Sequence, residues 1–473
     1  MFVNRVSELA WLEKRYQSGK AELVVLYGRR RVGKTELLAK FCASKPDPPY
    51  VFFAADQVPE PIQRANFSSV VNDAVFGKGQ VQAVYDSWDD LFVVLARQAQ
   101  TRRLLVVIDE FPYLVAAYPP LISILQRLWD QTLRSSQIML IVNGSYIGMM
   151  EEAVLAYHAP LYGRRTAQYL LEPLGFFDAQ TFFRAYAPDD RLRFYAVFGG
   201  TPAYLQTIRT EQSLEANIVE TILERGSLLY DEVRFVLQQE LREPRNYFAV
   251  LQAIAAGKTR QNEIKQASGL DSINPYLETL QDLHLIERTV PVTERQPHKS
   301  RRGLYRLKDN YFRFWFRFVL PNRSQLERGA KEMVFDTAIR SELDRFCAPV
   351  FEEVCRQYFW RAGLDGELAF APQQIGGWWQ ANQEVDIVVL SRSHAMLVEC
   401  KWSRRPVGID ILQGLEAKRL AVTREAGTQK VFFALCSRSG FTDQLIDLAK
   451  ARDDVFLYDW ERMSQLPPPE QQA

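Results

Sequence analysis

One octapeptide constrains this chain more than any other segment. Residues 28–35 read Gly-Arg-Arg-Arg-Val-Gly-Lys-Thr, which matches the pattern G-x-x-x-x-G-K-[ST] of phosphate-binding loops. The apolar run 23–26 precedes the loop, and a helical pattern begins at Glu36. The segment therefore reads as strand, glycine loop and helix, which is the context that the motif requires.

The same loop carries the groups that a nucleoside triphosphate needs. Backbone N–H groups and the N-terminus of the following helix surround phosphates. Lys34 is expected to add charge near the β- and γ-phosphates, and the Thr35 hydroxyl to ligate Mg²⁺. Whether the three arginines contact nucleotide, acids at the sheet end, DNA or only solvent stays open. We predict that ATP and Mg²⁺ bind here through Gly28, Arg29, Arg30, Arg31, Val32, Gly33, Lys34, Thr35 and Glu36.

A second apolar run ends in two acids. Residues 104–108 read Leu-Leu-Val-Val-Ile and lead into Asp109 and Glu110. Such a continuous run is typical of a strand that is buried on both faces of a parallel sheet. We expect Asp109 to hold Mg²⁺ directly or through water, and Glu110 to polarise the hydrolytic water. The pair therefore predicts hydrolysis as well as binding.

Two further segments carry groups that could sense the nucleotide. The apolar strand 137–142 ends near Asn143 and Ser145, which could contact the γ-phosphate or the attacking water, or serve only in a strand-to-helix turn. A later turn carries Arg164 and Arg165. One of these arginines could reach the γ-phosphate of a neighbouring subunit in a homo-oligomer; a solvated or acid-paired arginine is the alternative.

The order of these motifs carries a family resemblance. Along the chain follow Asn4-Arg5, the glycine loop, Asp109-Glu110, Asn143-Gly-Ser145, Gly163-Arg164-Arg165 and the glycine-containing segment 198–205. This order resembles the archaeal-type ATPase family, within the AAA+/STAND group of P-loop proteins. The resemblance implies a doubly wound parallel α/β core over residues 1–170 and a helical lid over residues 171–240. It also implies that Asn4 and Arg5 lie near the adenine.

Residues 241–325 read as three helices followed by two strands. The helical patterns begin near Tyr247, Thr259 and Asp271, and the strands lie at 285–292 and 304–307. This order resembles a winged helix, whose third helix would enter a major groove of DNA. The loop before the second strand carries Arg295, Lys299, Arg301 and Arg302, which would lie on phosphates. DNA contact and a purely structural or dimerising role both stay open.

A hairpin near the C-terminus gathers charged side chains. Residues 384–390 and 396–402 read as two strands joined by a short turn. Because strand side chains alternate, Glu399 and Lys401 share one face, and Asp386 on the neighbouring strand can reach it. Two carboxylates and a lysine at this place predict a Mg²⁺ site with a cation that steadies the attacking hydroxide.

The region 326–473 resembles the PD-(D/E)XK nuclease superfamily, with its order of helix, Asp strand, E-x-K strand, helix and strand. A domain of this type, called DUF234, follows the ATPase in the archaeal-type family. The resemblance implies a restriction-endonuclease-like α/β domain in which Asp386 and Glu399 bind metal, Lys401 is catalytic and Glu353 assists. Val385 stands where the proline of the motif is expected. An inactive domain that keeps the fold stays the alternative.

Composition limits the partners and the compartment. The formal net charge is +1, so contact with DNA must use local basic patches. The five cysteines are scattered without a C-x-x-C pair, which favours a reducing cytoplasm. We expect no membrane span.

Together these patterns predict a cytoplasmic, Mg²⁺-dependent ATPase that acts on or binds DNA through its winged helix and its nuclease-like domain. The alternative is a STAND-like signalling or scaffold protein, which uses nucleotide as a switch and carries an inactive nuclease fold.

Overall fold

The structure is a computed structural model that describes residues 2–45, 50–157, 159–241 and 243–465. The chain divides into two compact units, with the boundary between Pro173 and Leu174. We call them the N-terminal unit and the C-terminal unit and describe each by itself. The boundary lies close to the domain limit expected after residue 170.

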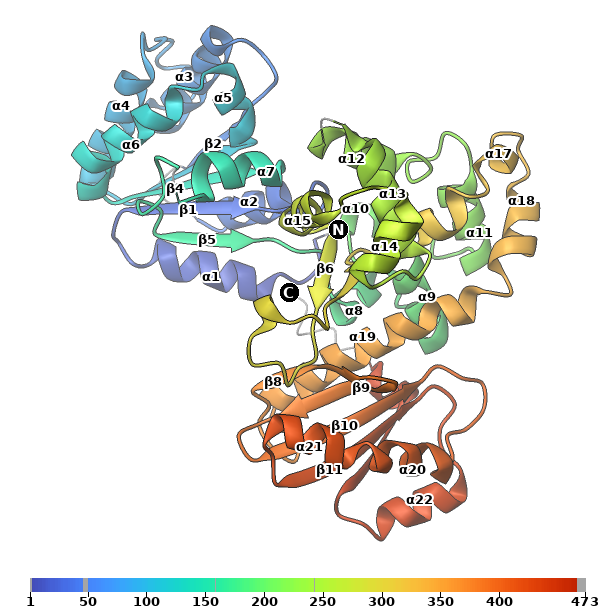
Figure 1. The fold of residues 1–473 in the computed structure, drawn as a ribbon. Coiled ribbons are helices and arrows are strands. Elements are labelled where there is room, and N and C mark those ends of the chain that lie inside the picture. Colours follow the sequence, from blue (N-terminus) through green and yellow to red (C-terminus); the bar gives the residue numbers. More distant parts are fainter. Residues whose placement is uncertain (1, 46–49, 158, 242, 466–473) are drawn as a thin grey trace. The chain divides into compact units, whose positions relative to one another are not determined.

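A five-stranded sheet forms the centre of the N-terminal unit (Figure 1). Its strands are β1 (Glu22–Tyr27), β2 (Val51–Ala54), β3 (Leu104–Asp109), β4 (Ile138–Gly144) and β5 (Ala167–Leu170). Their order is β2-β3-β4-β1-β5, and all neighbouring strands are parallel. The carboxyl ends of β1, β3 and β4 therefore meet at one edge, where the sequence places the glycine loop and the acids.

Helices cover both faces of this sheet. They are α1 (Val6–Tyr16), α2 (Lys34–Ala43), α3 (Glu60–Phe76), α4 (Trp88–Thr101), α5 (Phe111–Ala117), α6 (Leu121–Gln131) and α7 (Ile147–Met150). Side chains alternate along β1, so Leu23 and Val25 pack with α3 to α6, whereas Val24 and Leu26 pack with α1 and α2. Two apolar cores on a parallel sheet confirm the predicted doubly wound α/β class.

The C-terminal unit begins with short helices: α8 (Phe176–Ala179), α9 (Pro188–Phe198), α10 (Pro202–Leu205), α11 (Leu214–Ile218) and α12 (Glu232–Glu240). The glycine pair between α9 and α10 has a steric reason. A Cβ on Gly200 would lie 1.8 Å from the carbonyl oxygen of Leu174, whose own N–H donates to the carbonyl of Gly200. Only glycine lets the two backbones approach so closely.

Three helices and a hairpin follow, in the predicted order: α13 (Pro244–Ala255), α14 (Gln261–Ser268), α15 (Asn274–Asp282), β6 (Ile286–Thr289) and β7 (Leu304–Leu307). The two strands are antiparallel. The expected strand 285–292 ends early, because the N–H of Val292 bonds to the carbonyl of Gly377 in another strand. Short helices then lead on: α16 (Asn310–Phe314), α17 (Arg323–Leu326) and α18 (Lys331–Val334).

The last part of the C-terminal unit is a mixed sheet, here called the C-terminal sheet. Its strands are β8 (Gln374–Gln380), β9 (Gln383–Leu390), β10 (His394–Lys401), β11 (Lys430–Ser437) and β12 (Val455–Asp459). The order is β12-β11-β10-β9-β8. Strands β8, β9 and β10 pair antiparallel, whereas β10, β11 and β12 pair parallel.

Helix α19 (Leu343–Leu364) packs on one face of this sheet, and α20 (Ile409–Ala417), α21 (Arg419–Ala426) and α22 (Asp443–Lys450) lie on the other (Figure 1). The short α23 (Trp460–Met463) follows β12. The single helix expected after the E-x-K strand is divided at Lys418 into α20 and α21. The finer domain limits within the C-terminal unit, at residues 240 and 325, stay predictions.

No helix in the described ranges is both long enough and apolar enough to cross a bilayer.

Candidate functional site

The glycine loop has the backbone that its sequence requires. It joins β1 to α2 and contains three residues with positive φ: Gly28 at 152°, Arg31 at 68° and Gly33 at 91°. A Cβ on Gly28 would lie 2.3 Å from the carbonyl oxygen of Leu171. Glycine at position 28 therefore lets the loop pass directly beside the segment after β5.

Lys34 and Thr35 stand at the start of α2, where a helix N-terminus favours anions. The Lys34 ammonium is buried and donates to the carbonyl oxygens of Gly28 and Arg29, at 3.0 and 2.9 Å. The hydroxyl of Thr35 donates to Oδ2 of Asp109 at 2.7 Å. The glycine loop and the acid at the end of β3 are thus directly joined.

Asp109 is the centre of this arrangement. Its side chain is buried, and its Oδ1 accepts from the amide of Asn143 and, at 3.0 Å, from the N–H of Glu110. The Oδ1 of Asn143 is buried without a hydrogen-bond partner among the described residues. A buried, unsatisfied acceptor beside a carboxylate and a hydroxyl fits a hydrated Mg²⁺, whose ligand waters can donate to it. Thr35, Asp109 and Asn143 could therefore hold this ion.

Glu110 is held by a different residue. Its backbone is left-handed, with φ of 51°, and both carboxylate oxygens accept from the hydroxyl of Ser145, at 2.7 and 2.8 Å. The N–H of Ser145 also donates to Glu110, at 3.3 Å. A carboxylate fixed in this way has one orientation, as a group that aligns a water requires. Asn143 and Ser145 therefore have different partners: Asn143 bonds to Asp109, and Ser145 bonds to Glu110.

Two arginines near the loop are engaged with the protein. Arg5 is buried and donates to Glu8 at 2.8 Å, to the carbonyl of Val32 at 3.0 Å and to that of Glu172 at 2.8 Å. It therefore ties the glycine loop to the segment after β5. Arg30 donates to the hydroxyl of Tyr113 at 2.6 Å and lies over the ring of Tyr146.

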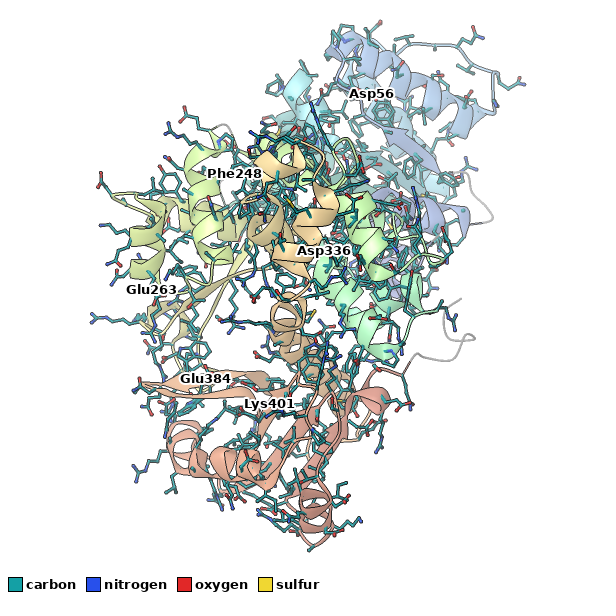
Figure 2. All side chains as sticks on the ribbon, turned by 90° about the vertical axis from the view of Figure 1, so that its right-hand side faces the viewer. Asp56, Phe248, Glu263, Asp336, Glu384 and Lys401 are labelled. Carbon is teal, nitrogen blue, oxygen red and sulfur yellow. The ribbon has the colours of Figure 1, made fainter. Side chains whose placement is uncertain are left out.

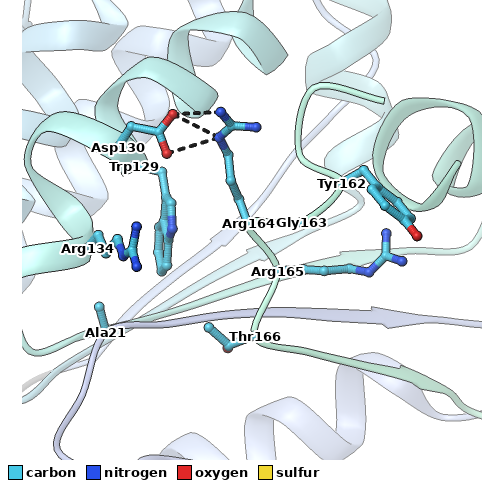
Figure 3. Close-up of a pocket in the computed structure, with 9 residues that line it drawn as sticks. All are labelled: Ala21, Trp129, Asp130, Arg134, Tyr162, Gly163, Arg164, Arg165 and Thr166. Atoms are coloured by element: carbon cyan, nitrogen blue, oxygen red, sulfur yellow. Dashed lines mark hydrogen bonds and ion pairs between the residues drawn. The ribbon is translucent and has the colours of Figure 1, made fainter. Parts of the chain in front are cut away.

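Arg164 and Arg165 lie at the opposite, amino edge of the sheet, just before β5. Arg164 forms an ion pair with Asp130 at 2.7 Å, so within one chain this side chain is acid-paired. Arg165 donates to the carbonyls of Val154 and Leu155 and lies over Tyr162. Figure 3 shows both beside a cavity of about 480 Å³ lined by Ala21, Trp129, Asp130, Arg134, Tyr162, Gly163, Arg164, Arg165 and Thr166.

A second set of charged groups lies on the C-terminal sheet, where β9 and β10 separate. Their register ends with Ile387 opposite Val398, and Asp386 and Glu399 are the next residues. The N–H of Cys400 donates to Oδ2 of Asp386 at 2.8 Å. The carboxylate thus replaces the backbone acceptor that the diverging strand no longer supplies.

Lysines neutralise one carboxylate of this set. Glu399 accepts from Lys401 at 2.6 Å and from Lys418 at 3.2 Å. Although burial lowers the pKa of Lys401, the charge and hydrogen bond of Glu399 raise it above its usual value. The three residues predicted from the sequence are therefore brought together, with Lys418 as an additional member. Figure 2 shows Lys401 and Glu384 on this sheet.

Asp386 stands in a more negative environment. Burial, followed by the charges of Glu352 and Glu399, raises the pKa of Asp386 to about 7. Burial also raises the pKa of Glu352, to which the charge of Glu384 adds. Carboxylates that disfavour one another's ionised form are the kind of set that a divalent cation stabilises. Their ligand atoms do not all lie within 4.8 Å of one another, so Asp386, Glu352 and Glu399 would have to move together to hold one ion.

The comparison with known proteins identifies the chain. A family model described as an ATPase domain predominantly from archaea matches residues 2–208, and DUF234, described as archaeal and bacterial proteins of unknown function, matches residues 315–419. The uncharacterized protein MJECL04 of Methanocaldococcus jannaschii is 32% identical over 85% of this chain and 88% of its own length. The chain belongs to this archaeal-type ATPase family.

Two other proteins are also similar to the chain, one over a short segment and one at low sequence identity. The uncharacterized ATP-binding protein MJ0423 of the same organism is 58% identical over 45 residues, which are 10% of this chain and 76% of that protein. The Walker-type ATPase PABY2304 of Pyrococcus abyssi is 20% identical, with a TM-score of 0.50 over 67% of this chain and 96% of that chain. The latter shows a shared fold. The family membership confirms the resemblance read from the motif order.

Two residues of the predicted sites, Glu353 and Arg302, contact other groups of the chain in the structure. The carboxylate of Glu353 accepts from Arg356 and, at 3.3 Å, from Gln357. The helix carboxylate that acts on Asp386 is Glu352, which the sequence reasoning missed. Glu352 lies three residues, about one helical turn, before the buried Cys355 of α19.

Arg302 is not free to lie on DNA. It forms ion pairs with Glu425 at 3.0 Å and with Glu294 at 3.2 Å, and its carbonyl accepts from the indole of Trp379. These contacts fasten the loop between β6 and β7 to the C-terminal sheet. Arg295, Lys299 and Arg301 of the same loop are exposed.

We expect Asp386→Asn to change the pH dependence of stability in a defined direction. Because the folded-state pKa of Asp386 lies above its ordinary value of 3.8, folding favours the protonated acid, and wild-type stability falls as the pH rises through the interval up to about 7. Asparagine removes this loss. The free energy of unfolding of the variant, relative to that of the wild type, should therefore rise by about 2–4 kcal/mol between pH 4 and pH 8. Urea unfolding at a series of pH values measures the gain.

The matched control is Asp453→Asn, which changes an exposed carboxylate of the same sheet region. This variant should follow the wild-type pH profile. A difference between Asp386→Asn and the wild type that is constant with pH would contradict the assignment.

Proposed function

We propose that the archaeal-type ATPase hydrolyses ATP with Mg²⁺ at the glycine loop of its N-terminal unit. The observation that carries the proposal is the convergence of Thr35, Asp109 and Asn143 at the carboxyl edge of the sheet, with Glu110 fixed beside them. Membership of the ATPase family supports it. When bound, Mg²⁺ would neutralise charge that develops on the transferred phosphoryl group.

Each side chain then has a distinct task. Lys34 binds the β- and γ-phosphates, and for this its ammonium leaves the two loop carbonyls that it contacts without ligand. Thr35 and Asp109 would hold the metal, and the buried, unpartnered Oδ1 of Asn143 would accept a hydrogen bond from a water beside it. Glu110 accepts the hydrogen bond of the attacking water and is kept in place by Ser145. The remaining loop residues, with Asn4 and Arg5, surround the nucleotide.

A homo-oligomer would complete the site. Arg164 and Arg165 lie at the amino edge of the sheet and so belong to a different part of the unit from the glycine loop. We propose that one of them reaches the γ-phosphate held by a neighbouring copy. Arg164 would exchange its exposed ion pair with Asp130 for the phosphate, at small cost because such surface pairs contribute little.

Glu110→Gln should separate binding from hydrolysis. The amide keeps the hydrogen bond with Ser145 but no longer accepts a proton, so turnover should fall about 100-fold or more while ATP affinity stays near the wild-type value. Lys34→Ala should lose both ATP binding and ATP turnover. Steady-state ATP turnover and equilibrium binding of a fluorescent ATP analogue measure the two quantities.

Asp86→Asn, which removes an exposed carboxylate of the same unit, serves as the control and should turn over ATP as the wild type does. Undiminished turnover by Lys34→Ala would remove the proposed site.

We further propose that the C-terminal unit binds DNA through the helices and hairpin of residues 244–307, used as a winged helix. The support is the exposed basic tip of its loop, Arg295, Lys299 and Arg301, together with the exposed Ser272 and Asn274 at the start of α15. Because the chain carries almost no net charge, this local patch must supply the attraction to phosphates.

The two adjacent arginines of this loop provide a matched pair of variants. Arg301→Ala should weaken DNA binding and reduce the slope of log K against log salt by about 1, because one phosphate contact is lost. Arg302→Ala should leave the slope unchanged but lower the stability of the C-terminal unit, since Glu425 and Glu294 lose their partner. Fluorescence anisotropy with duplex DNA at several salt concentrations measures the slopes. Equal slopes for all three proteins would contradict DNA contact by the loop.

A second candidate activity is Mg²⁺-dependent DNA cleavage by a PD-(D/E)XK-like C-terminal domain. It is favoured by Asp386, Glu399 and Lys401 at the separation of β9 and β10, with Glu352 on α19 in place of Glu353. Asp386 and Glu399 would hold the metal, and Lys401 would steady the attacking hydroxide. Ion binding would require Glu399 to release Lys418.

Plasmid nicking tests this activity and the helix assignment together. Asp386→Asn and Glu352→Gln should each lower nicking by about 100-fold or more, whereas Glu353→Gln should retain it, because its carboxylate is paired with Arg356. ATP turnover should survive in all three. If the wild type and Asp386→Asn nick equally, the domain is not a nuclease.

The rival reading is a STAND-like switch or scaffold with an inactive nuclease fold. The fixed Glu110 favours hydrolysis over a slow switch. All five cysteines are free, which supports the proposed cytoplasmic location.

A further inference from the structure

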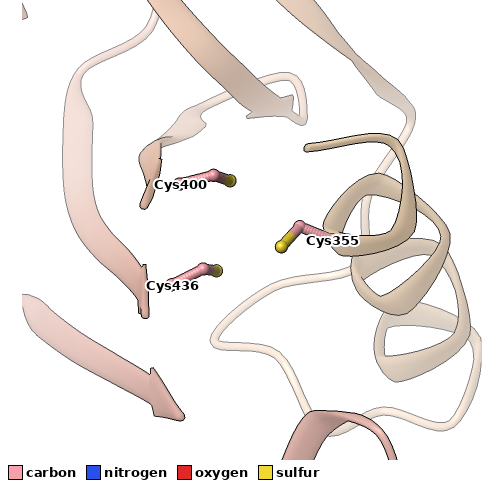
Figure 4. Close-up of side chains that lie close together, drawn as sticks. All are labelled: Cys355, Cys400 and Cys436. Atoms are coloured by element: carbon pink, nitrogen blue, oxygen red, sulfur yellow. The ribbon is translucent and has the colours of Figure 1, made fainter. Parts of the chain in front are cut away.

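Three cysteines far apart in the sequence meet inside the C-terminal unit. Cys355 comes from α19, Cys400 from β10 and Cys436 from β11. Figure 4 shows Cys355 pointing from its helix toward the two strand cysteines. All three side chains are buried, and their sulfur atoms lie within 4.8 Å of one another. In the part of the chain that the structure describes, no other group of three or more His, Cys, Asp and Glu ligand atoms is gathered so closely.

The fold explains why the sulfurs converge. Cys400 and Cys436 are direct partners in the parallel register of β10 and β11, so their side chains stand side by side on one face of the sheet. Helix α19 covers this face and brings Cys355 over the pair. The site is thus built from three separate elements of a rigid core, not from one mobile loop.

The thiols satisfy one another only in part. A thiol is a weak donor, and a buried cysteine normally behaves as a small apolar residue. Burial raises the pKa of Cys436, but hydrogen bonds from Cys355 and Cys400 outweigh it and lower this pKa to about 6. Burial raises the pKa of the other two thiols, Cys355 and Cys400. A thiolate is the form that ligates soft metals, so each of the three cysteines would ligate after losing its proton.

We propose that Cys355, Cys400 and Cys436 form a binding site for a soft, thiophilic cation, such as Zn²⁺ or Cu⁺. Zinc–sulfur bonds of about 2.3 Å place tetrahedral ligand sulfurs about 3.8 Å apart, so an inward movement of at most about 0.6 Å per sulfur closes the site. Each thiol that ligates releases its proton to solvent. The cation offsets the negative charge that the buried thiolates would otherwise carry.

A bound ion at this position would affect two parts of the C-terminal unit. It fastens α19 to β10 and β11, which stabilises the C-terminal sheet. It also lies behind the charged set described above, because Cys400 stands between Glu399 and Lys401 and its N–H donates to Asp386. The metal site itself depends on neither ATP nor DNA.

Metal content of the full-length protein tests the proposal. The reduced, metal-free chain is incubated separately with Zn²⁺ and with Cu⁺, desalted and analysed by elemental mass spectrometry. We expect the wild type to retain about one ion per chain, with a midpoint of thermal unfolding several degrees higher. If the chain retains zinc, copper or both, the result supports the site and shows which ion it binds.

The chain offers matched controls. Cys355→Ala, Cys400→Ala and Cys436→Ala should each lose the ion, whereas Cys347→Ala and Cys42→Ala remove equally buried cysteines outside the cluster and should retain it. Loss of the ion in Asp386→Asn combined with retention in Cys436→Ala would overturn the proposal, as would absence of a retained ion in both arms.

A measurement on the wild type keeps the test valid if a cysteine variant fails to fold. X-ray absorption of the zinc- or copper-loaded chain should show sulfur neighbours at about 2.3 Å. Only oxygen and nitrogen neighbours, or a disulfide that withdraws two of the three thiols from alkylation, would overturn the assignment.

Discussion

The carboxyl edge of the parallel sheet depends on Asp109, whose side chain is hydrogen-bonded to three segments at once. One oxygen accepts from Thr35 at the start of α2, and the other accepts from Asn143 of β4 and from the N–H of Glu110. Bonds to an ionised acceptor are stronger than neutral ones, and here they are buried. They hold the glycine loop, Asp109 and Glu110 in register before a ligand arrives, which is the preorganisation that the proposed phosphoryl transfer would use.

Most of this edge could be predicted from the sequence, because parallel strands leave little freedom. Residues that follow the carboxyl ends of neighbouring strands must meet, and the glycine loop fixes which edge is used. The roles of Asn143 and Ser145 could not be separated in this way. They depend on the left-handed backbone of Glu110, which turns that carboxylate toward Ser145 and away from the position of Asn143. A positive φ at a glutamate leaves no pattern in a single sequence.

The C-terminal unit shows the limits of local patterns more clearly. Adjacent residues of a helix point about 100° apart, so choosing between Glu352 and Glu353 requires knowledge of which side of α19 meets the sheet. The apolar spacing around Cys355 holds that information, but only once the sheet is known to lie there. For Arg302 no local signal exists, since its partner Glu425 is 123 residues away. A basic loop therefore reads as a DNA contact even though one of its arginines fastens the loop to its own sheet.

Asp109 and Asp386 show how two carboxylates at strand ends can be prepared differently for a cation. Asp109 accepts hydrogen bonds from Thr35, from Asn143 and from the N–H of Glu110, so an added metal would extend an existing network. Asp386 has one backbone donor and faces Glu352 and Glu399, so its ionised form is disfavoured until a positive charge arrives. An ion at Asp386 would therefore bind in competition with protons near neutral pH, and its occupancy would rise with pH. The first site is built from hydrogen bonds, whereas at the second site either a proton or a cation relieves the repulsion among the carboxylates.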